Sequence, residues 1–242
     1  MPPSRTTPSL PPGGGCGLCA GQQQCLLGRQ DEKRRAGWKP LLVEHPVRKG
    51  ELLLRQGQSG QKTFKIVKTG IVVVLCSGED GVERPIGLFG AGQPLGSTAL
   101  VQEPAAVSCR ALTAGRICEV SVEAVLQQGL LDSELLRGLA QSYAHTNARL
   151  ADWARIARIR GVTGQLAATL LQLAHLQRSS LVRLPSHQVL ADLLSTTRET
   201  IARTLRQLAL RHGLVRRDRW HCEIQRDVLA GLAGGPAQQA GI

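Results

Sequence analysis

Residues 195–210 read STTRETIARTLRQLAL, and this stretch decides the fold of the C-terminal part of the chain. Ile201, Leu205 and Leu208 follow one another at intervals of four and three, so they share one face of a helix. Thr197 precedes this helix and is a residue type that caps helix N-termini through its hydroxyl oxygen. The opposite face is rich in arginine. The stretch therefore predicts a helix that packs through one side and offers the other side to a partner.

The segments around this helix predict a helix-turn-helix domain with a wing. A preceding helix opens at Pro185-Ser186, and residues 214–224 read as a strand, a turn and a second strand. Between Arg183 and Arg219 there are eight arginines and three acidic residues. Because Arg can fork onto guanine and Glu can accept from cytosine, this face predicts binding to double-stranded DNA. The residues predicted to contact DNA are Thr197, Arg198, Glu199, Ala202, Arg203 and Arg206.

The composition agrees with a nucleic-acid partner and argues against a membrane protein, a secreted protein and an enzyme. The 242 residues carry a formal net charge of +12, which favours a polyanion. We find no signal-peptide pattern and no apolar run of the roughly 18 residues that a membrane span needs, so we expect a cytoplasmic protein without a membrane partner. The seven cysteines favour free thiols over a secreted disulfide framework. We do not expect an enzyme, since no nucleophile–base pairing, phosphate loop or HExxH motif is found.

A long helix is predicted over residues 126–160. Its apolar stripe recurs at alternating intervals of four and three, and so long a seam cannot be buried against one small β-domain. We therefore expect a dimerisation helix that pairs with a second copy of the chain. The alternative is that the stripe packs on the neighbouring β-domain. The predicted interface residues are Leu139, Tyr143, Thr146, Leu150, Trp153 and Ala157.

The rest of the chain divides into segments that differ in composition and in the pattern of apolar residues. Residues 40–125 alternate short apolar runs with turn segments, which predicts a β-barrel or a β-sandwich. Residues 1–39 are rich in Pro and Gly and then charged, so we expect a flexible arm that is ordered only by a ligand or by docking. Residues 161–228 form the winged helix-turn-helix domain, and residues 229–242 are expected to be a flexible tail. The predicted fold class is α+β.

Three cysteines lie close together in the arm, as Cys16, Cys19 and Cys25. A CxxC pair is shared by zinc sites and redox dithiols, but structural zinc prefers a second CxxC or a His pair, and neither is found. An iron–sulfur cluster needs four thiolates that converge, and a glycine-flanked arm suits three of them. A fourth ligand would have to come from elsewhere in the chain.

The order of barrel, long helix and winged helix-turn-helix with Arg-Glu-Thr-Ile-Ala-Arg resembles the Crp/Fnr superfamily of bacterial transcription regulators over roughly residues 40–225. The arm cysteines resemble the oxygen-sensing Fnr branch, in which three N-terminal cysteines and one barrel cysteine hold a [4Fe-4S] cluster. The resemblance implies Cys118 as the fourth ligand, with Cys109 as its competitor. Cys76 and Cys222 are expected to be ordinary buried or wing cysteines.

The same resemblance implies a homodimer that binds palindromic operators in double-stranded DNA, acts with RNA polymerase and senses oxygen through the cluster. A Crp-like regulator of another small ligand or of nitric oxide, and a zinc or dithiol site, remain alternatives. A cyclic nucleotide is disfavoured, because no Glu follows Gly92 or Gly96 and no Arg precedes Ser108 to pair with its phosphate. Recognition helices of the Fnr branch carry Ser at the position of Ala202 and have no Arg at the position of Arg198. This chain differs from that branch at both positions, and the difference implies operator half-sites nearer TGTGA than TTGAT.

Overall fold

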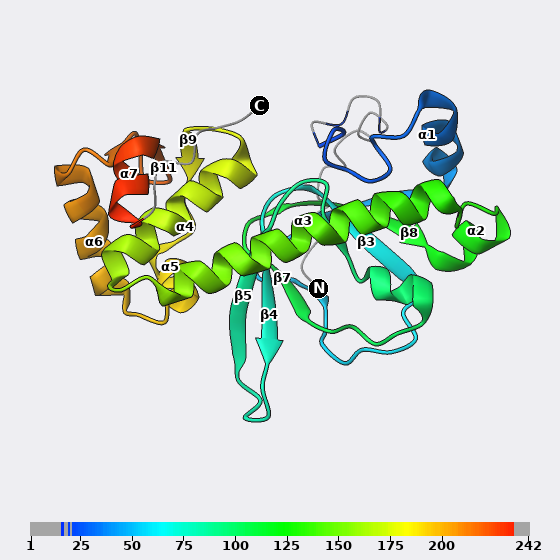
Figure 1. The fold of residues 1–242 in the computed structure, drawn as a ribbon, viewed down its shortest axis with the longest axis horizontal. Coiled ribbons are helices and arrows are strands. Elements are labelled where there is room, and N and C mark those ends of the chain that lie inside the picture. Colours follow the sequence, from blue (N-terminus) through cyan, green and yellow to red (C-terminus); the bar gives the residue numbers. More distant parts are fainter. Residues whose placement is uncertain (1–15, 17–18, 20, 235–242) are drawn as a thin grey trace, which may run out of the picture.

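A β-domain, a long helix and a helical C-terminal domain follow one another along the chain (Figure 1). The computed structural model describes residues 16, 19 and 21–234. The remaining residues of the predicted arm and tail, 1–15, 17–18, 20 and 235–242, lie outside the described residues. In the part of the chain that the structure describes, no helix is long and apolar enough to cross a membrane.

The predicted β-barrel consists of two antiparallel four-stranded sheets, with strand orders β1-β8-β3-β6 and β2-β7-β4-β5. Within β4, Val72 and Val74 point into the core between the sheets, whereas Val73 and Leu75 point outward to a core shared with the helices. Both faces of this strand are covered, which explains why its sequence is apolar throughout instead of alternating. The strands are β1 (Leu42–Val47), β2 (Leu52–Leu54), β3 (Thr63–Thr69), β4 (Val72–Ser77), β5 (Glu83–Phe89), β6 (Pro94–Leu95), β7 (Ser108–Ala111) and β8 (Gly115–Ser121), and the short 3₁₀ helix η3 (Ser97–Val101) follows β6.

Residues 21–38 are not a flexible arm but fold onto the β-domain, by the docking that is expected as one source of order in the arm. Helix α1 (Glu32–Trp38) begins after Asp31, whose side chain accepts from the Arg34 backbone N–H at 2.9 Å, and the 3₁₀ helix η2 (Lys39–Leu41) follows. Leu26, Leu27 and Trp38 are buried against the first sheet. These apolar side chains supply the docking that the charged and glycine-rich composition of the arm conceals.

The long helix α3 spans Ser133–Arg158, so the predicted range 126–160 is too long at its N-terminal end. A separate short helix, α2 (Val122–Gln127), precedes it. Asp132 ends the connection between them, because its carboxylate accepts from the backbone N–H groups of Glu134 and Leu135 and caps α3. Figure 1 shows α3 crossing the β-domain and reaching the C-terminal domain.

The C-terminal domain contains the predicted helix-turn-helix and wing. Helix α4 (Val162–Gln177) is buried along most of its length, and α5 (His187–Leu193) and α6 (Arg198–Leu210) form the two helices of the motif. Strands β10 (Leu214–Arg216) and β11 (His221–Ile224) form the wing, joined by a third strand, β9 (Leu181–Arg183). A last helix, α7 (Arg226–Leu232), buries Leu229 completely. The flexible tail predicted from residue 229 is therefore wrong for the residues up to 234.

Candidate metal centre and nucleic-acid interface

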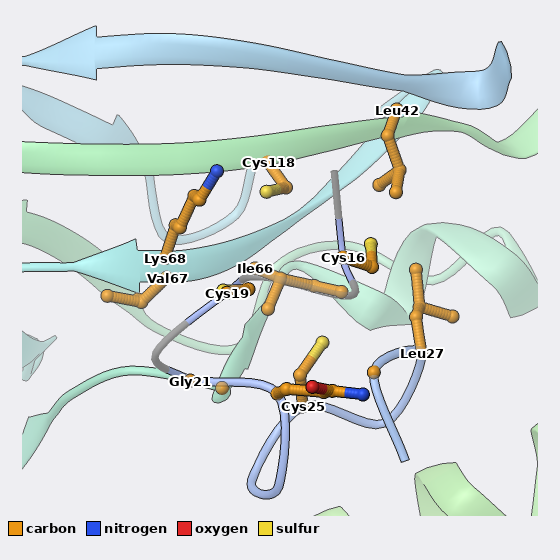
Figure 2. A pocket seen from close by; sticks show the side chains of 13 residues that line it. Cys16, Cys19, Gly21, Cys25, Leu27, Leu42, Ile66, Val67, Lys68 and Cys118 are labelled. Atoms are coloured by element: carbon orange, nitrogen blue, oxygen red, sulfur yellow. The ribbon is translucent and has the colours of Figure 1, made fainter. Parts of the chain in front are cut away.

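The three arm cysteines and Cys118 line one cavity between the docked arm and the first sheet (Figure 2). Its space not filled by protein atoms is about 360 Å³, open solvent at the mouth included. In Figure 2 the sulfur atoms of Cys25 and Cys118 point into this space from opposite walls. The structure thus brings together the four residues that the sequence and the family resemblance single out.

Strand geometry explains why Cys118 reaches the cavity. Along β8, Ile117 points into the core between the two sheets, whereas Cys118 and Val120 point to the opposite face, which the arm covers. In register with Cys118 lies Ile66 of β3, which lines the same cavity. The alternation of side chains along a strand therefore places the thiol on the arm side of the sheet.

Two glycines allow close backbone contacts at the cavity, one between the β-domain and the arm and one within the arm itself. A Cβ atom at Gly92, where φ is +86°, would lie 2.6 Å from the carbonyl carbon of Gln24. A Cβ atom at Gly28 would lie 2.6 Å from the carbonyl oxygen of Gln22. Any larger residue at either position has to displace backbone, so the cavity depends on both glycines.

Burial raises the pKa of Cys16, Cys25 and Cys118 and so favours the protonated thiol. It raises the pKa of Cys118 to about 12, with Lys68 opposing the shift. It also raises the pKa of Cys25, against the backbone N–H groups of Gly28 and Leu27. The pKa of Cys16 is raised by burial and by the nearby Cys19. A bound metal group would displace these protons, since only the thiolate is a ligand.

A charged group that the sequence analysis missed lies beside Cys118. Lys68 donates to Glu44 Oε2 at 2.7 Å, and Arg116 forms a second ion pair with the same carboxylate. Burial would raise the pKa of Glu44, but the hydrogen bonds from Lys68 and Arg116 outweigh it and lower the pKa. No sequence signal finds this group, because a lysine or a glutamate in a strand usually reads as a solvent-facing residue.

The other cysteines lie elsewhere. Cys109 belongs to β7 of the second sheet and is buried in the core between the sheets, where burial raises its pKa to about 12. Cys222 is buried in the core of the wing, and Cys76 is half-buried at the end of β4. Cys118, and not Cys109, therefore lies with the arm cysteines.

Among the residues that the structure describes, no group of three or more His, Cys, Asp or Glu side chains is close enough together to hold one metal ion. A mononuclear zinc site needs all its thiolates at about 2.3 Å from one atom. In a polynuclear cluster each cysteine binds a different iron atom, so the ligands lie farther apart.

The predicted DNA-reading face is exposed on α6. Thr197 caps the helix by accepting from the Thr200 backbone N–H at 3.2 Å, and Ile201, Leu205 and Leu208 are buried. The guanidinium groups of the face have no ion pair with any carboxylate of the described residues, so they are available to phosphates and base edges. Thr197, Arg198, Glu199, Arg203 and Arg206 are exposed, and Ala202 is half-buried.

The predicted dimer stripe divides between two faces of α3. Leu139 and Trp153 are buried within the single chain, and the Trp153 indole N–H donates to the Pro85 carbonyl at 2.9 Å. Leu150 packs against Gly87 of β5. These three residues therefore contact their own chain, as the alternative interpretation expects. The helix is long enough to cover the barrel and still reach the next domain.

The other members of the stripe are more accessible. Tyr143 is 44% exposed, with its hydroxyl 2.7 Å from the hydroxyl of Ser97. Thr146 is half-buried, and Ala157 is exposed. Beside Tyr143 runs a row of exposed residues at intervals of four, seven and seven. This row consists of Leu136, Ala140, Asn147 and Ala154.

Comparisons with known proteins agree with this architecture. A family model described as cyclic nucleotide-binding domain matches residues 44–129, and one described as Crp-like helix-turn-helix domain matches residues 164–232. Together the two matches cover more than half of the chain. No curated protein matches the sequence.

Several solved structures share the fold. FixK2 from Bradyrhizobium japonicum is 20% identical with a TM-score of 0.67, over 81% of this chain and 99% of that one. A CRP-family transcriptional regulator from Thermus thermophilus is 19% identical with a TM-score of 0.63, over 81% of this chain and all of its own. A CRP/FNR-family regulator from the same organism is 21% identical with a TM-score of 0.59, over 80% and 99%. At these identities the likeness concerns the fold.

Proposed function

The chain belongs to the Crp/Fnr family of DNA-binding transcription regulators, which are not enzymes, and from this premise we propose that it senses oxygen through a [4Fe-4S] cluster. The ligands would be Cys16, Cys19, Cys25 and Cys118. The observation that carries the proposal is the convergence of these four thiols on one cavity, from an arm and a strand that are distant in sequence.

The surroundings of the thiols fit such a group. The backbone N–H groups of Gly28 and Leu27 interact with the Cys25 sulfur, and the Lys68 ammonium acts on Cys118. Both stabilise thiolate charge, as hydrogen bonds and charges around cluster ligands do.

When bound, the cluster would supply iron that oxygen can oxidise, together with four bonds that tie the arm to β8. The arm in turn contacts the beginning of α3. Leu26 packs beside Gly138, and Arg34 forms ion pairs with Asp132 at 2.6 Å and Glu134 at 3.0 Å. Holding the arm in place therefore holds the N-terminal half of α3.

The far end of the same helix belongs to the core of the C-terminal domain. Trp153 and Ile156 of α3 share one apolar cluster with Leu166, Leu170 and the helices of the DNA-binding motif. A change at the arm end of this rigid helix can thus alter how the recognition helix is presented. This gives oxygen a route to DNA affinity through residues of the chain itself.

We further propose that the protein acts in the cytoplasm as a homodimer on palindromic operators, together with RNA polymerase. The exposed row on α3, continued by Tyr143 and Ala157, supports pairing with a second copy, because it is the uncharged side of the helix. Two recognition helices then grip two half-sites at once, and loosening the pair lowers DNA affinity steeply.

Metal analysis tests the proposal. The protein is purified without air, and iron, acid-labile sulfide and zinc are measured per chain. We expect a brown protein with about four iron and four sulfide atoms, both lost on exposure to air. A colourless protein that carries zinc and no sulfide would assign the cavity to the zinc alternative instead.

A further inference from the structure

A second cavity separates the β-domain from the C-terminal domain. It holds about 2190 Å³ of space not filled by atoms, open solvent included. One wall is made by turns of the β-domain around Thr69–Ile71 and Thr113-Ala114, and α3 contributes His145 and Arg149. The opposite wall is made by the end of α4, by Arg183 of β9 and by Arg226 of α7. We name this cavity the interdomain cleft.

The lining of the interdomain cleft is strongly basic. It contains five Lys or Arg residues and two histidines, and no Asp or Glu. Lys68 is neutralised by Glu44, but the guanidinium groups of Arg149, Arg183 and Arg226 have no ion pair within the described residues. Unpaired cations from two domains thus face one shared space.

These charges are close enough to act on one another. Burial lowers the pKa of His175, and the charges of Arg149, Arg226 and Arg178 lower it further. Burial also lowers the pKa of Arg149, against a weak opposing effect of Asp152. Arg149 is half-buried, and Arg183 and Arg226 are exposed. Like charges gathered around one space repel one another, and a bound anion would relieve this repulsion.

The cleft arginines are poorly placed to bind the DNA that α6 reads. In Figure 1 α6 lies at the outer edge of the C-terminal domain, whereas α4 and β9 lie on the side of the β-domain. Contact with the same DNA duplex would require it to pass between the two domains. A small ligand fits the location better than a duplex does.

We propose that the interdomain cleft binds a small molecule that carries two or more phosphate groups. Arginine forks match phosphate oxygens in pairs, and several separate guanidinium groups call for more than one phosphate. Because Arg149 belongs to α3 and Arg183 and Arg226 belong to the DNA-binding domain, such a ligand bridges the two domains. It would fix the orientation of the DNA-binding domain relative to the sensor.

The cleft also touches the cysteine cavity. Gly21 and Lys68 line both spaces, so a ligand in the cleft lies next to the docked arm. The proposal does not rest on the cluster, however, since the cleft residues are complete without it. It adds an anionic effector to the regulation of the same DNA-binding domain.

Calorimetric titration of the full-length protein with inorganic pyrophosphate tests the inference. We expect pyrophosphate to bind more tightly than orthophosphate, and Arg149→Gln and Arg226→Gln each to weaken it by at least about tenfold. The matched control is Arg155→Gln, which removes the same charge from an exposed position of α3 outside the cleft and should bind as the parent does. A parallel titration with adenosine diphosphate asks whether the phosphates belong to a larger molecule, and tighter binding than pyrophosphate would say that they do.

Three results would overturn the proposal. Pyrophosphate could fail to bind at millimolar concentration, or Arg155→Gln could weaken it as much as the cleft variants do. Alternatively, Arg149→Gln and Arg226→Gln could lower affinity for random-sequence duplex DNA and leave pyrophosphate binding unchanged, which would make the cleft a nucleic-acid contact. Without the anion, the midpoint temperature of thermal unfolding should be unchanged or raised in both variants, since each removes an unpaired cation.

Discussion

The recognition helix and the cysteine cavity are the two candidate sites of this chain, and they are built in opposite ways. Helix α6 carries its cap, its buried face and its exposed arginines within one continuous segment, Thr197–Leu210. The cysteine cavity draws its residues from a turn in the arm, from β3 and from β8. The first site needs only local periodicity, and the second exists only when the arm docks.

This difference predicts different sensitivities. A substitution on the exposed face of α6 changes one contact to DNA and leaves the helix intact. A substitution in the cavity, or at a glycine that the arm packs against, removes a site whose parts do not meet otherwise. Helix α3 connects the two sites, so changes along it should show which of its faces serves the chain's own fold and which serves a partner.

Loss of one cysteine should have the largest effect. We expect Cys118→Ser to abolish the bound iron and sulfide completely, because it removes a ligand and exposes a coordination position to water and oxygen. The control is Cys109→Ser, in the neighbouring sheet and outside the cavity, which should keep both. Iron and sulfide analysis under anaerobic conditions measures the outcome. A normal cluster in Cys118→Ser and none in Cys109→Ser would show that Cys109, and not Cys118, is the fourth ligand.

Trp153→Ala should destabilise the fold by about 3–5 kcal/mol, because it empties a buried site and leaves the Pro85 carbonyl without its donor. Urea unfolding at several protein concentrations separates this effect from dimer dissociation. If the variant only dissociated, with an unchanged free energy of unfolding for the single chain, Trp153 would belong to the dimer seam after all.

Ala140→Arg should produce a folded monomer. In a symmetric dimer, both copies would bring this charge into the proposed interface along α3, where it would have to be desolvated. We expect DNA affinity to fall by about 100-fold, since one recognition helix then binds alone. Gln141→Arg, exposed on the opposite flank of α3, carries the same charge and should remain dimeric. Sedimentation velocity gives the oligomeric state of both, and two dimers would place the seam elsewhere.

The smallest effects are expected on α6 itself. Arg203→Ala should cost about 1–3 kcal/mol of DNA binding and relax one guanine position, whereas Arg206→Ala should weaken all sequences alike. Selection of bound DNA sequences from a random pool, done without oxygen, measures the sequence preference of both variants and of the parent protein. For the parent we expect half-sites nearer TGTGA than TTGAT. Enrichment of TTGAT would mean that Arg198 faces the DNA backbone.

Sequence reasoning did best where the relevant contacts are local. The Thr197 cap, the buried Ile201 and Leu205, and the order of α5, α6 and the wing all follow from spacings within a few residues. It did less well at the ends of elements. The start of α3 depends on the Asp132 cap, and α7 is held by the burial of Leu229 against distant partners.

The faces of α3 show the limit most clearly. Spacing alone placed Leu139, Leu150 and Trp153 on a stripe, but it could not say whether the barrel or a second chain covers that stripe. Only the packed structure assigned Leu139 and Trp153 to the chain's own core and left Leu136 and Ala140 exposed. An apolar helical face specifies that it is to be buried and not what buries it.

The sequence by itself determined the domain order, the recognition helix and the three arm cysteines, because these features are written in short-range periodicity and residue type. The tertiary structure alone decided that Cys118 and not Cys109 meets the arm, that Lys68 stands beside it, and that unpaired arginines of two domains share one cleft. These are contacts between segments far apart in the chain. They depend on which strand faces which helix, and that is settled by packing the whole core.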